Sequence, residues 1–189
     1  MTSKKEHLID VAEASRMGCS MLVPVLLSYV VPYLLIWKSH LSKEFFVVGY
    51  LDVVPAFLYP PLVVLVIFIG IILHEGLHGL AWSICSKAGW ASIRFGIMKP
   101  SYTPYCHCIE PLRVRQYIFG ALTPLFVLGM LPAIYALITG NWLFLIFGFF
   151  FTVTAVGDVM IVMKMRKLHA STIVLDHPSE AGFYVLEKR

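Results

Sequence analysis

The sequence predicts an all-α polytopic membrane protein with about four transmembrane helices and a small cytoplasmic β-hairpin or sheet element. Of its 189 residues, 59% are hydrophobic and 14% are charged, whereas a soluble domain is nearer half apolar and a quarter charged. The mean hydropathy is +0.80, and the apolar residues form blocks of about 20, enough to cross a bilayer. We therefore expect a single membrane domain over residues 1–189.

Four apolar blocks give the predicted membrane spans, at residues 17–37, 60–85, 117–138 and 142–163. Pro60 and Pro61 suit the start of the second span, because the first turn of a helix does not use its N–H groups. We expect a short cytoplasmic helix at 1–16. We expect an outer loop at 38–59, with an interfacial piece near 45–50.

Two segments between and after the spans are rich in strand patterns. Residues 91–97 alternate apolar and polar side chains, the pattern of a half-buried strand. The tail contains two short strand-like runs, 171–175 and 182–186. The strand-rich segments 88–115 and 168–189 are predicted to share one face of the membrane, where they could pair into one small sheet.

Basic residues predict the orientation of the chain. The side that holds both termini and residues 88–115 carries most of the Lys and Arg near the spans, whereas the other side carries only Lys38 and Lys43. Positive residues accumulate on the cytoplasmic side, so both termini are expected in the cytoplasm. The net charge of +4 reflects this topology, and we expect no nucleic-acid partner.

Two further observations concern the compartment. Cys106 and Cys108 are too close in sequence for an ordinary disulfide, and no second pair completes a four-thiolate zinc site. We therefore expect reduced cysteines. We expect no cleavable signal peptide, because a polar segment precedes the first apolar block and no small-residue cleavage site follows it.

The most informative stretch is His74-Glu75-Gly76-Leu77-His78, an H-E-x-x-H motif inside the second predicted span. Histidines four residues apart lie on one face of a helix, so His74 and His78 can present their imidazoles to one metal ion. Ionisable groups inside a bilayer are costly and usually functional. The motif therefore predicts a zinc site within the membrane.

Glu75 is the predicted catalytic residue. It follows His74 directly and would point to the side of the ion, where its carboxylate can take a proton from a water molecule on the metal. Zinc lowers the pKa of such a water toward about 7. Glu75 would then pass the proton to the leaving amine of a peptide.

A catalytic zinc also needs a third protein ligand and an open position. The first and third predicted spans contain no Asp, Glu or His, and the fourth contains Asp158. At about 1.5 Å per residue, His74 and His78 lie roughly 21 and 27 Å from Pro60, and Asp158 roughly 24 Å from Trp142. The second and fourth spans run in the same direction, so these depths match and Asp158 is the predicted third ligand.

The residues leave alternatives open. The motif could be a hydrogen-bonded polar cluster between helices or the lining of a pore. Asp158 could hydrogen-bond to Thr154 or Thr123, although Thr154 could equally orient Asp158 as a ligand. His107 is the alternative third ligand, and residues 105–110 around it are expected to form a surface loop near the site.

The motif with Gly79, taken together with Gly157-Asp158, resembles the site-2-protease type of intramembrane zinc metalloprotease. The chain is closer still to a family of small bacterial membrane proteins described as putative zincin peptidases, a resemblance that covers most of residues 60–189. These resemblances imply His74, His78 and Asp158 as zinc ligands and Glu75 as the catalytic carboxylate. They also imply a bacterial cytoplasmic membrane.

The sequence thus predicts a zinc-dependent intramembrane or membrane-embedded peptidase. Its partners would be the lipid bilayer and a membrane-protein or peptide substrate, which strand 91–97 could hold by β-addition. The alternative is a non-catalytic metal-binding membrane scaffold or transporter-like protein that uses the same ligands. Glu75 favours the enzyme, because a binding protein with Asp158 as ligand has no evident use for it.

Overall fold

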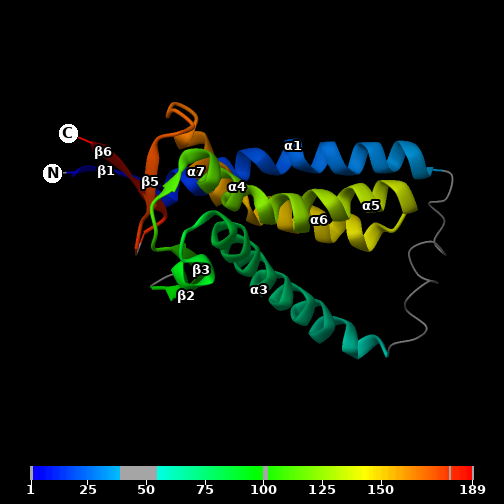
Figure 1. Cartoon of the computed structure of the whole chain (residues 1–189). Coiled ribbons are helices and arrows are strands. Elements are labelled where there is room, and N and C mark those ends of the chain that lie inside the picture. The colour runs from blue at the N-terminus through cyan, green and yellow to red at the C-terminus, as the bar shows by residue number, and fades with distance from the viewer. Residues whose placement is uncertain (1, 39–54, 100–101, 179, 189) are drawn as a thin grey trace.

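The computed structural model describes residues 2–38, 55–99, 102–178 and 180–188 (Figure 1). The predicted interfacial piece near 45–50 lies outside these residues. The described chain is mainly helical, with two small antiparallel sheets at one end. Both termini lie at that same end, beyond the sheets (Figure 1).

Long apolar helices form most of the molecule. Helix α1 covers Val11–Trp37 and α3 covers Tyr59–Cys85. Helices α4 (Val114–Pro124) and α5 (Leu131–Thr139) are joined by a π-helical turn, Leu125–Met130, into one long rod. Helices α6 (Trp142–Thr154) and α7 (Val156–Met165) follow. Among the described residues, three helices are long and apolar enough to cross a membrane, or four if α6 and α7 count as one bent span.

Local chemistry accounts for the ends of these helices. Asp10 caps α1 by accepting a hydrogen bond from the Ala12 N–H at 3.1 Å. The two prolines that open α3 stand in its first turn, as the sequence predicts. Gly140 ends α5 with a φ of 76°, which glycine adopts without steric cost. Asn141 then caps α6 through the Leu143 N–H at 3.1 Å.

The fourth apolar block differs from its prediction as one helix. It bends by 45° between Thr154 and Val156. The bend turns α7 away from the line of α6 and places Asp158 in the first turn of α7. This break is therefore part of how the chain positions that carboxylate.

The helices are arranged as a bundle from which α3 diverges (Figure 1). Helix α1 meets α6 through a hydrogen bond of 2.7 Å between the Tyr29 and Thr152 hydroxyls. The C-terminal part of α3 packs on α4, where the Trp82 indole N–H donates to the Tyr117 carbonyl at 3.1 Å. The N-terminal half of α3 exposes apolar side chains on several sides, for example Val64 and Phe68.

Two β elements cover the end of the bundle. A hairpin pairs β2 (Ile93–Met98) with β3 (Thr103–Cys108) in antiparallel register, Ile93 opposite Cys108. A four-stranded sheet has the order β1-β6-β5-β4. Its strands are β1 (Thr2–Leu8), β4 (Leu112–Arg113), β5 (Ile173–Asp176) and β6 (Gly182–Lys188).

The strand predictions are confirmed in part. Both tail strands form, and β4 brings the 88–115 segment into their sheet, but most of that segment forms the separate hairpin. The predicted strand 91–97 begins two residues late, because residues Gly89–Ser92 form a 3₁₀ turn. The Ser92 hydroxyl donates to the Gly89 carbonyl at 2.7 Å and holds this turn.

The prediction of a helix at residues 1–16 is wrong for its first half. Residues Thr2–Leu8 form β1, which pairs antiparallel with β6 so that Lys5 lies opposite Val185. Without β1, the backbone groups along this edge of β6 would have no strand partner. Pairing across nearly the whole chain length therefore overrides a weak local helix preference, and the helix starts only after the Asp10 cap.

The main core lies where α3, α4, α7 and both β elements meet. Its most buried large side chains include Tyr117 from α4, Met165 from α7 and Phe183 from β6, each at most 1% exposed. Trp82 from α3 and Cys108 from β3 join the same cluster. The core therefore holds the C-terminal part of α3, which carries the H-E-x-x-H motif. The N-terminal part of that helix does not contribute to this core.

Candidate metal centre

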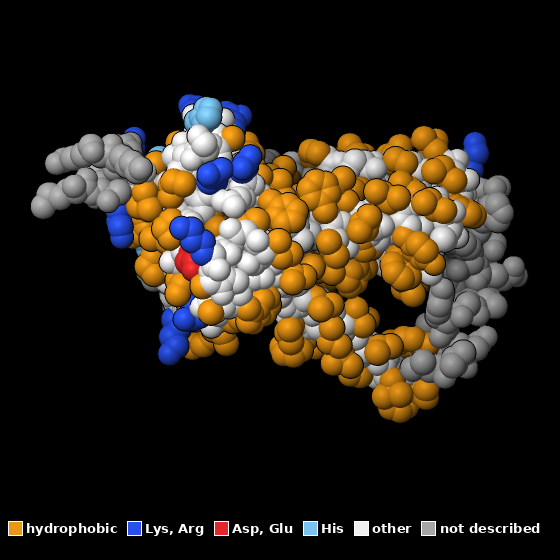
Figure 2. Space-filling model, in the orientation of Figure 1, with side chains coloured by type: hydrophobic (Ala, Val, Ile, Leu, Met, Phe, Trp, Pro, Cys, Tyr) orange, Lys and Arg blue, Asp and Glu red, His pale blue; other side chains and the backbone are white. Residues whose placement is uncertain are grey.

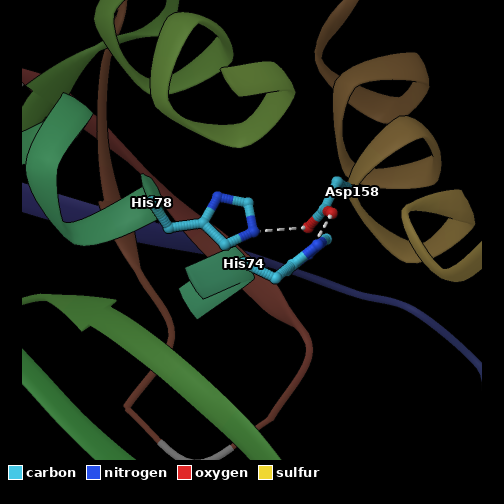
Figure 3. A group of neighbouring side chains, drawn as sticks. All are labelled: His74, His78 and Asp158. Carbon is cyan, nitrogen blue, oxygen red and sulfur yellow. Dashed lines mark ion pairs between the residues drawn. The ribbon is translucent and has the colours of Figure 1, made fainter. Parts of the chain in front are cut away.

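His74, His78 and Asp158 come together between α3 and α7 (Figure 3). The His74 Nε2 atom lies 3.3 Å from Asp158 Oδ2, and the His78 Nε2 atom lies 3.3 Å from Asp158 Oδ1. One ligand atom from each residue lies within 4.8 Å of the other two. The three side chains that the sequence predicts as ligands thus converge on one point.

The donor atoms are oriented as a metal site requires. The Gly120 carbonyl lies 2.9 Å from His78 Nδ1, and because a carbonyl only accepts, Nδ1 must carry the proton. The Nε2 lone pair is then directed at the Asp158 carboxylate, and two acceptors face each other unless a cation or a further proton lies between them. This is the arrangement by which proteins fix metal-binding histidines.

The spacing also fits zinc. With metal–ligand distances of about 2.0–2.2 Å, the ligand atoms of a tetrahedral zinc site lie roughly 3.3–3.6 Å apart. The two imidazole-to-carboxylate distances, each 3.3 Å and each to a different oxygen of Asp158, fall at the lower end of this range. Two imidazoles and one carboxylate are a donor set of catalytic zinc sites, which leave a further position open. The residues present therefore fit a zinc ion.

Trp82 and Tyr117 support His78 from behind. The Trp82 ring stacks on the His78 imidazole with centroids 5.2 Å apart, and Tyr117 packs against Trp82 at 5.1 Å. Gly120 makes this possible, because a Cβ there would lie 2.0 Å from the Trp82 Nε1 atom. The role of Trp82 was not predicted from the sequence, although His74, His78 and Trp82 recur at four-residue intervals on one helical face.

Glu75 lies beside the three ligand candidates and faces strand β3. The backbone N–H of Cys106 is directed at its carboxylate. The hairpin comes this close to α3 at Gly79, where a Cβ would lie 2.8 Å from the Phe95 ring and 3.3 Å from the Cys106 sulfur. Glu75 is therefore positioned between the histidines and the outer edge of β3.

The pairing of the hairpin explains why this edge faces the site. In an antiparallel pair, alternate residues turn their N–H and C=O groups away from the partner strand. The Cys108 N–H donates to Asp176 at 3.2 Å, and the Cys106 N–H, two residues earlier, points to Glu75. The outward-facing backbone of β3 thus runs past the candidate catalytic carboxylate.

Asp176 joins the hairpin, α4 and the larger sheet. Its carboxylate accepts hydrogen bonds from the Tyr117 hydroxyl at 2.7 Å and the Cys108 N–H at 3.2 Å, and it lies 3.1 Å from His107 Nδ1. The sequence predicts only a turn at Asp176, because no local pattern signals partners about 60 residues away. His107, the alternative third ligand, pairs with Asp176 and does not join the metal cluster found among the described residues.

The other expected neighbours of Asp158 do not contact it. The Thr154 hydroxyl donates to the Phe151 carbonyl and the Thr123 hydroxyl to the Phe119 carbonyl. A Cβ at Gly157 would have no atom within 4 Å, so this glycine is not a point of close helix approach.

The hairpin cysteines behave as structural thiols. Burial, followed by the negative charges of Glu75 and Asp176, raises the pKa of the Cys106 thiol well above its ordinary value. Burial also raises the pKa of the Cys108 thiol. Metal ligation and nucleophilic attack both require a thiolate, so these residues stay protonated and pack against their neighbours.

Comparison with known families matches residues 67–173 of the chain to a family described as "Putative zincin peptidase". The chain belongs to this putative zincin peptidase family. The matched range includes His74, Glu75, His78 and Asp158, and it ends shortly before Asp176. No curated protein and no solved structure matches the chain. For this member of the family, the arrangement around α3 and α7 therefore carries the functional argument.

Proposed function

We propose that this protein is a zinc-dependent peptidase whose active site lies within or beside the lipid bilayer. The observation that carries the proposal is the convergence of His74, His78 and Asp158, with Glu75 next to them. The protein's membership of the putative zincin peptidase family also supports a peptidase reaction.

His74, His78 and Asp158 would hold the ion. A zinc ion so held polarises a peptide carbonyl and makes water more acidic. Glu75 would accept the proton of the attacking water and deliver it to the amine of the departing peptide. The Gly120 carbonyl keeps His78 in the tautomer that leaves Nε2 free.

An extended substrate would lie along the outer edge of β2, which has no second strand partner among the described residues. The sequence-based hypothesis gave this role to residues 91–97, which form β2 and the turn before it. The outward N–H groups of β3 at Cys106 and Cys108 are already directed at Glu75 and Asp176, so β2 offers the free edge of the hairpin. Backbone hydrogen bonds to a strand edge bind a peptide in extended form, and a peptide must be extended for its scissile bond to be reached.

The membrane placement is part of the proposal. The long apolar helices support it, as does the distribution of charge, because Lys and Arg gather at the end of the molecule that carries the β elements (Figure 2). We infer that this end is cytoplasmic, in a bacterial cytoplasmic membrane. Helix α3 exposes apolar side chains over its N-terminal half, so a membrane-protein substrate could approach the site from the bilayer.

The rival function is a metal-binding scaffold or transporter subunit without catalysis. Glu75 distinguishes a peptidase from a metal-binding protein without catalysis, because the metal cluster found among the described residues does not include Glu75. We expect Glu75→Gln to reduce cleavage of quenched fluorescent peptides by at least 10²-fold, the lower range for a general base, while zinc stays bound. Glu180→Gln, an exposed carboxylate in the tail, is the matched control. Undiminished cleavage by Glu75→Gln would exclude the proposed mechanism.

A further inference from the structure

A cavity of about 410 Å³ opens between the start of α1 and the end of α7. We propose that this cavity binds the phosphate headgroup of an anionic phospholipid. The inference rests on the membrane placement proposed above, but not on the peptidase reaction.

The charged lining of the cavity suits an anion. Lys164, Arg166 and Lys167 line it, together with one carboxylate, Glu13. Three positive charges against one negative leave a net charge of +2, with His7 counted as neutral. The negative end of the α7 dipole opposes an anion by only about half a charge, so the cavity remains attractive to a phosphate.

Two of the three cationic side chains are available to bind a phosphate. The Lys164 ammonium is held by Glu13 at 3.1 Å and by the Leu8 carbonyl at 3.0 Å. Within the described part of the chain, neither Arg166 nor Lys167 forms an ion pair, and both side chains are exposed. A guanidinium beside an ammonium is a favourable pair for a phosphate, because the guanidinium can bind two oxygens at once.

The apolar lining indicates a lipid and not a free phosphate. Met17 from α1 and Met160 and Met163 from α7 form the rest of the wall. Methionine adapts its shape to irregular apolar partners such as acyl chains. A ligand with a phosphate and an attached hydrocarbon chain would contact both parts, whereas inorganic phosphate would leave the methionines uncovered.

The level of the cavity in the membrane also fits a headgroup. Met17 lies two residues inside the first candidate span, which starts at Ser15, and Met163 lies two residues before the end of the bent α6–α7 pair. Both helices therefore change from apolar to charged residues at this height, and the basic residues come from the end of α7. Basic pockets between helix ends on the cytoplasmic side are typical sites for anionic lipid heads.

Such a lipid would bridge α1 and α7, which already meet here through the Lys164–Glu13 ion pair. It would touch α1 near Met17 and α7 near Arg166, and α7 carries Asp158 two turns earlier. We therefore expect the lipid to hold the α7 end in place.

Native mass spectrometry of the full-length protein in detergent tests the proposal. We expect phosphatidylglycerol to bind at least tenfold more tightly than phosphatidylcholine with the same acyl chains. Arg166→Gln/Lys167→Gln should lower phosphatidylglycerol affinity roughly 30-fold. The control Lys87→Gln/Lys99→Gln removes equal charge from exposed residues beside the hairpin and should keep the affinity.

Equal affinity for the two lipids, or an equal loss of phosphatidylglycerol affinity in both double variants, would contradict the proposed binding site. Displacement of the lipid by millimolar inorganic phosphate would overturn the lipid assignment. Thermal unfolding checks that the variants fold, and Lys167→Gln alone should still weaken binding about fivefold. The lipid preference should persist in Glu75→Gln, so a failure here is distinct from a failure of the peptidase proposal.

Discussion

At the scale of single residues, Gly120 does two things for the metal centre. Its carbonyl accepts the His78 Nδ1–H hydrogen bond, and its missing side chain leaves room for Trp82. Groups that orient a metal-binding histidine affect the site nearly as much as the ligands themselves. Gly120 is therefore a sensitive non-ligand position of the metal centre.

We predict that Gly120→Ala destabilises the protein by about 1–3 kcal/mol, the usual range for overpacking a core. The added methyl group would overlap the Trp82 ring, and displacing that ring would loosen His78. Zinc affinity should therefore fall roughly 10- to 100-fold. Thermal unfolding in detergent and competition with a zinc chelator measure the two effects.

Gly18→Ala is the matched control for this prediction. A Cβ at Gly18 would have no atom within 4 Å, so this substitution in α1 should leave stability and zinc affinity unchanged. If Gly120→Ala behaved in the same way, the close packing of α4 on α3 would be wrong.

The sequence predicts the side chains of this site better than its supports. The four-residue spacing of His74 and His78 and the matching depth of Asp158 both follow from helix geometry. The role of the Gly120 carbonyl could not be predicted, because every residue of the chain carries the same backbone oxygen. Only the packing of α4 on α3 selects this one.

At the scale of elements, Asp176 decides where the hairpin lies. It binds β3 through Cys108 and α4 through Tyr117, while itself ending β5. Because Cys106 is two residues from Cys108 on the same strand edge, this anchor also sets the distance between β3 and Glu75. The position of the hairpin, which carries the proposed substrate-binding strand β2, therefore depends on a residue outside the metal centre.

We predict an energetic coupling of about 0.5–3 kcal/mol between Asp176→Ala and Tyr117→Phe in a double-mutant cycle of unfolding free energies. Removing Asp176 leaves a buried hydroxyl and a backbone N–H without their partner, which costs about 1–3 kcal/mol. Asp176→Ala combined with Ser20→Ala, an exposed hydroxyl on α1, should be additive. A coupling near zero between Asp176 and Tyr117 would contradict the anchoring role.

Elements formed by local patterns are predicted well, and those formed by distant pairing are not. The first two predicted spans end at the same residues as α1 and α3, Trp37 and Cys85. Strand β1 escapes prediction because its partner, β6, is more than 170 residues away in sequence. The bend between α6 and α7 has no proline to announce it, and Gly157 stands just after the break.

At the scale of the whole molecule, charge and apolar surface define two ends. Figure 2 shows orange apolar side chains over the described helices and blue Lys and Arg mainly at the end that carries the β elements. This separation matches a chain whose basic end faces the cytoplasm. In that orientation, the proposed active site lies in the cytoplasmic half of the bilayer, close to the hairpin.

Cysteine labelling tests this orientation. In a background without the native cysteines, Ser171→Cys, which is exposed near β5, should react with a membrane-impermeant maleimide only after the cells are permeabilised. Thr139→Cys, exposed at the end of α5, should react in intact cells. The opposite pattern would invert the proposed topology and place the β elements outside.

Zinc analysis of the purified protein and its variants tests directly whether His74, His78 and Asp158 hold a zinc ion. We predict about one zinc per chain in the wild type and in Glu75→Gln, and less than about a tenth of that in His78→Ala and in Asp158→Ala, because a catalytic site needs all three protein ligands. Full zinc occupancy in Asp158→Ala would place the third ligand elsewhere. Wild-type protein that takes up no zinc at all would contradict the zinc site itself.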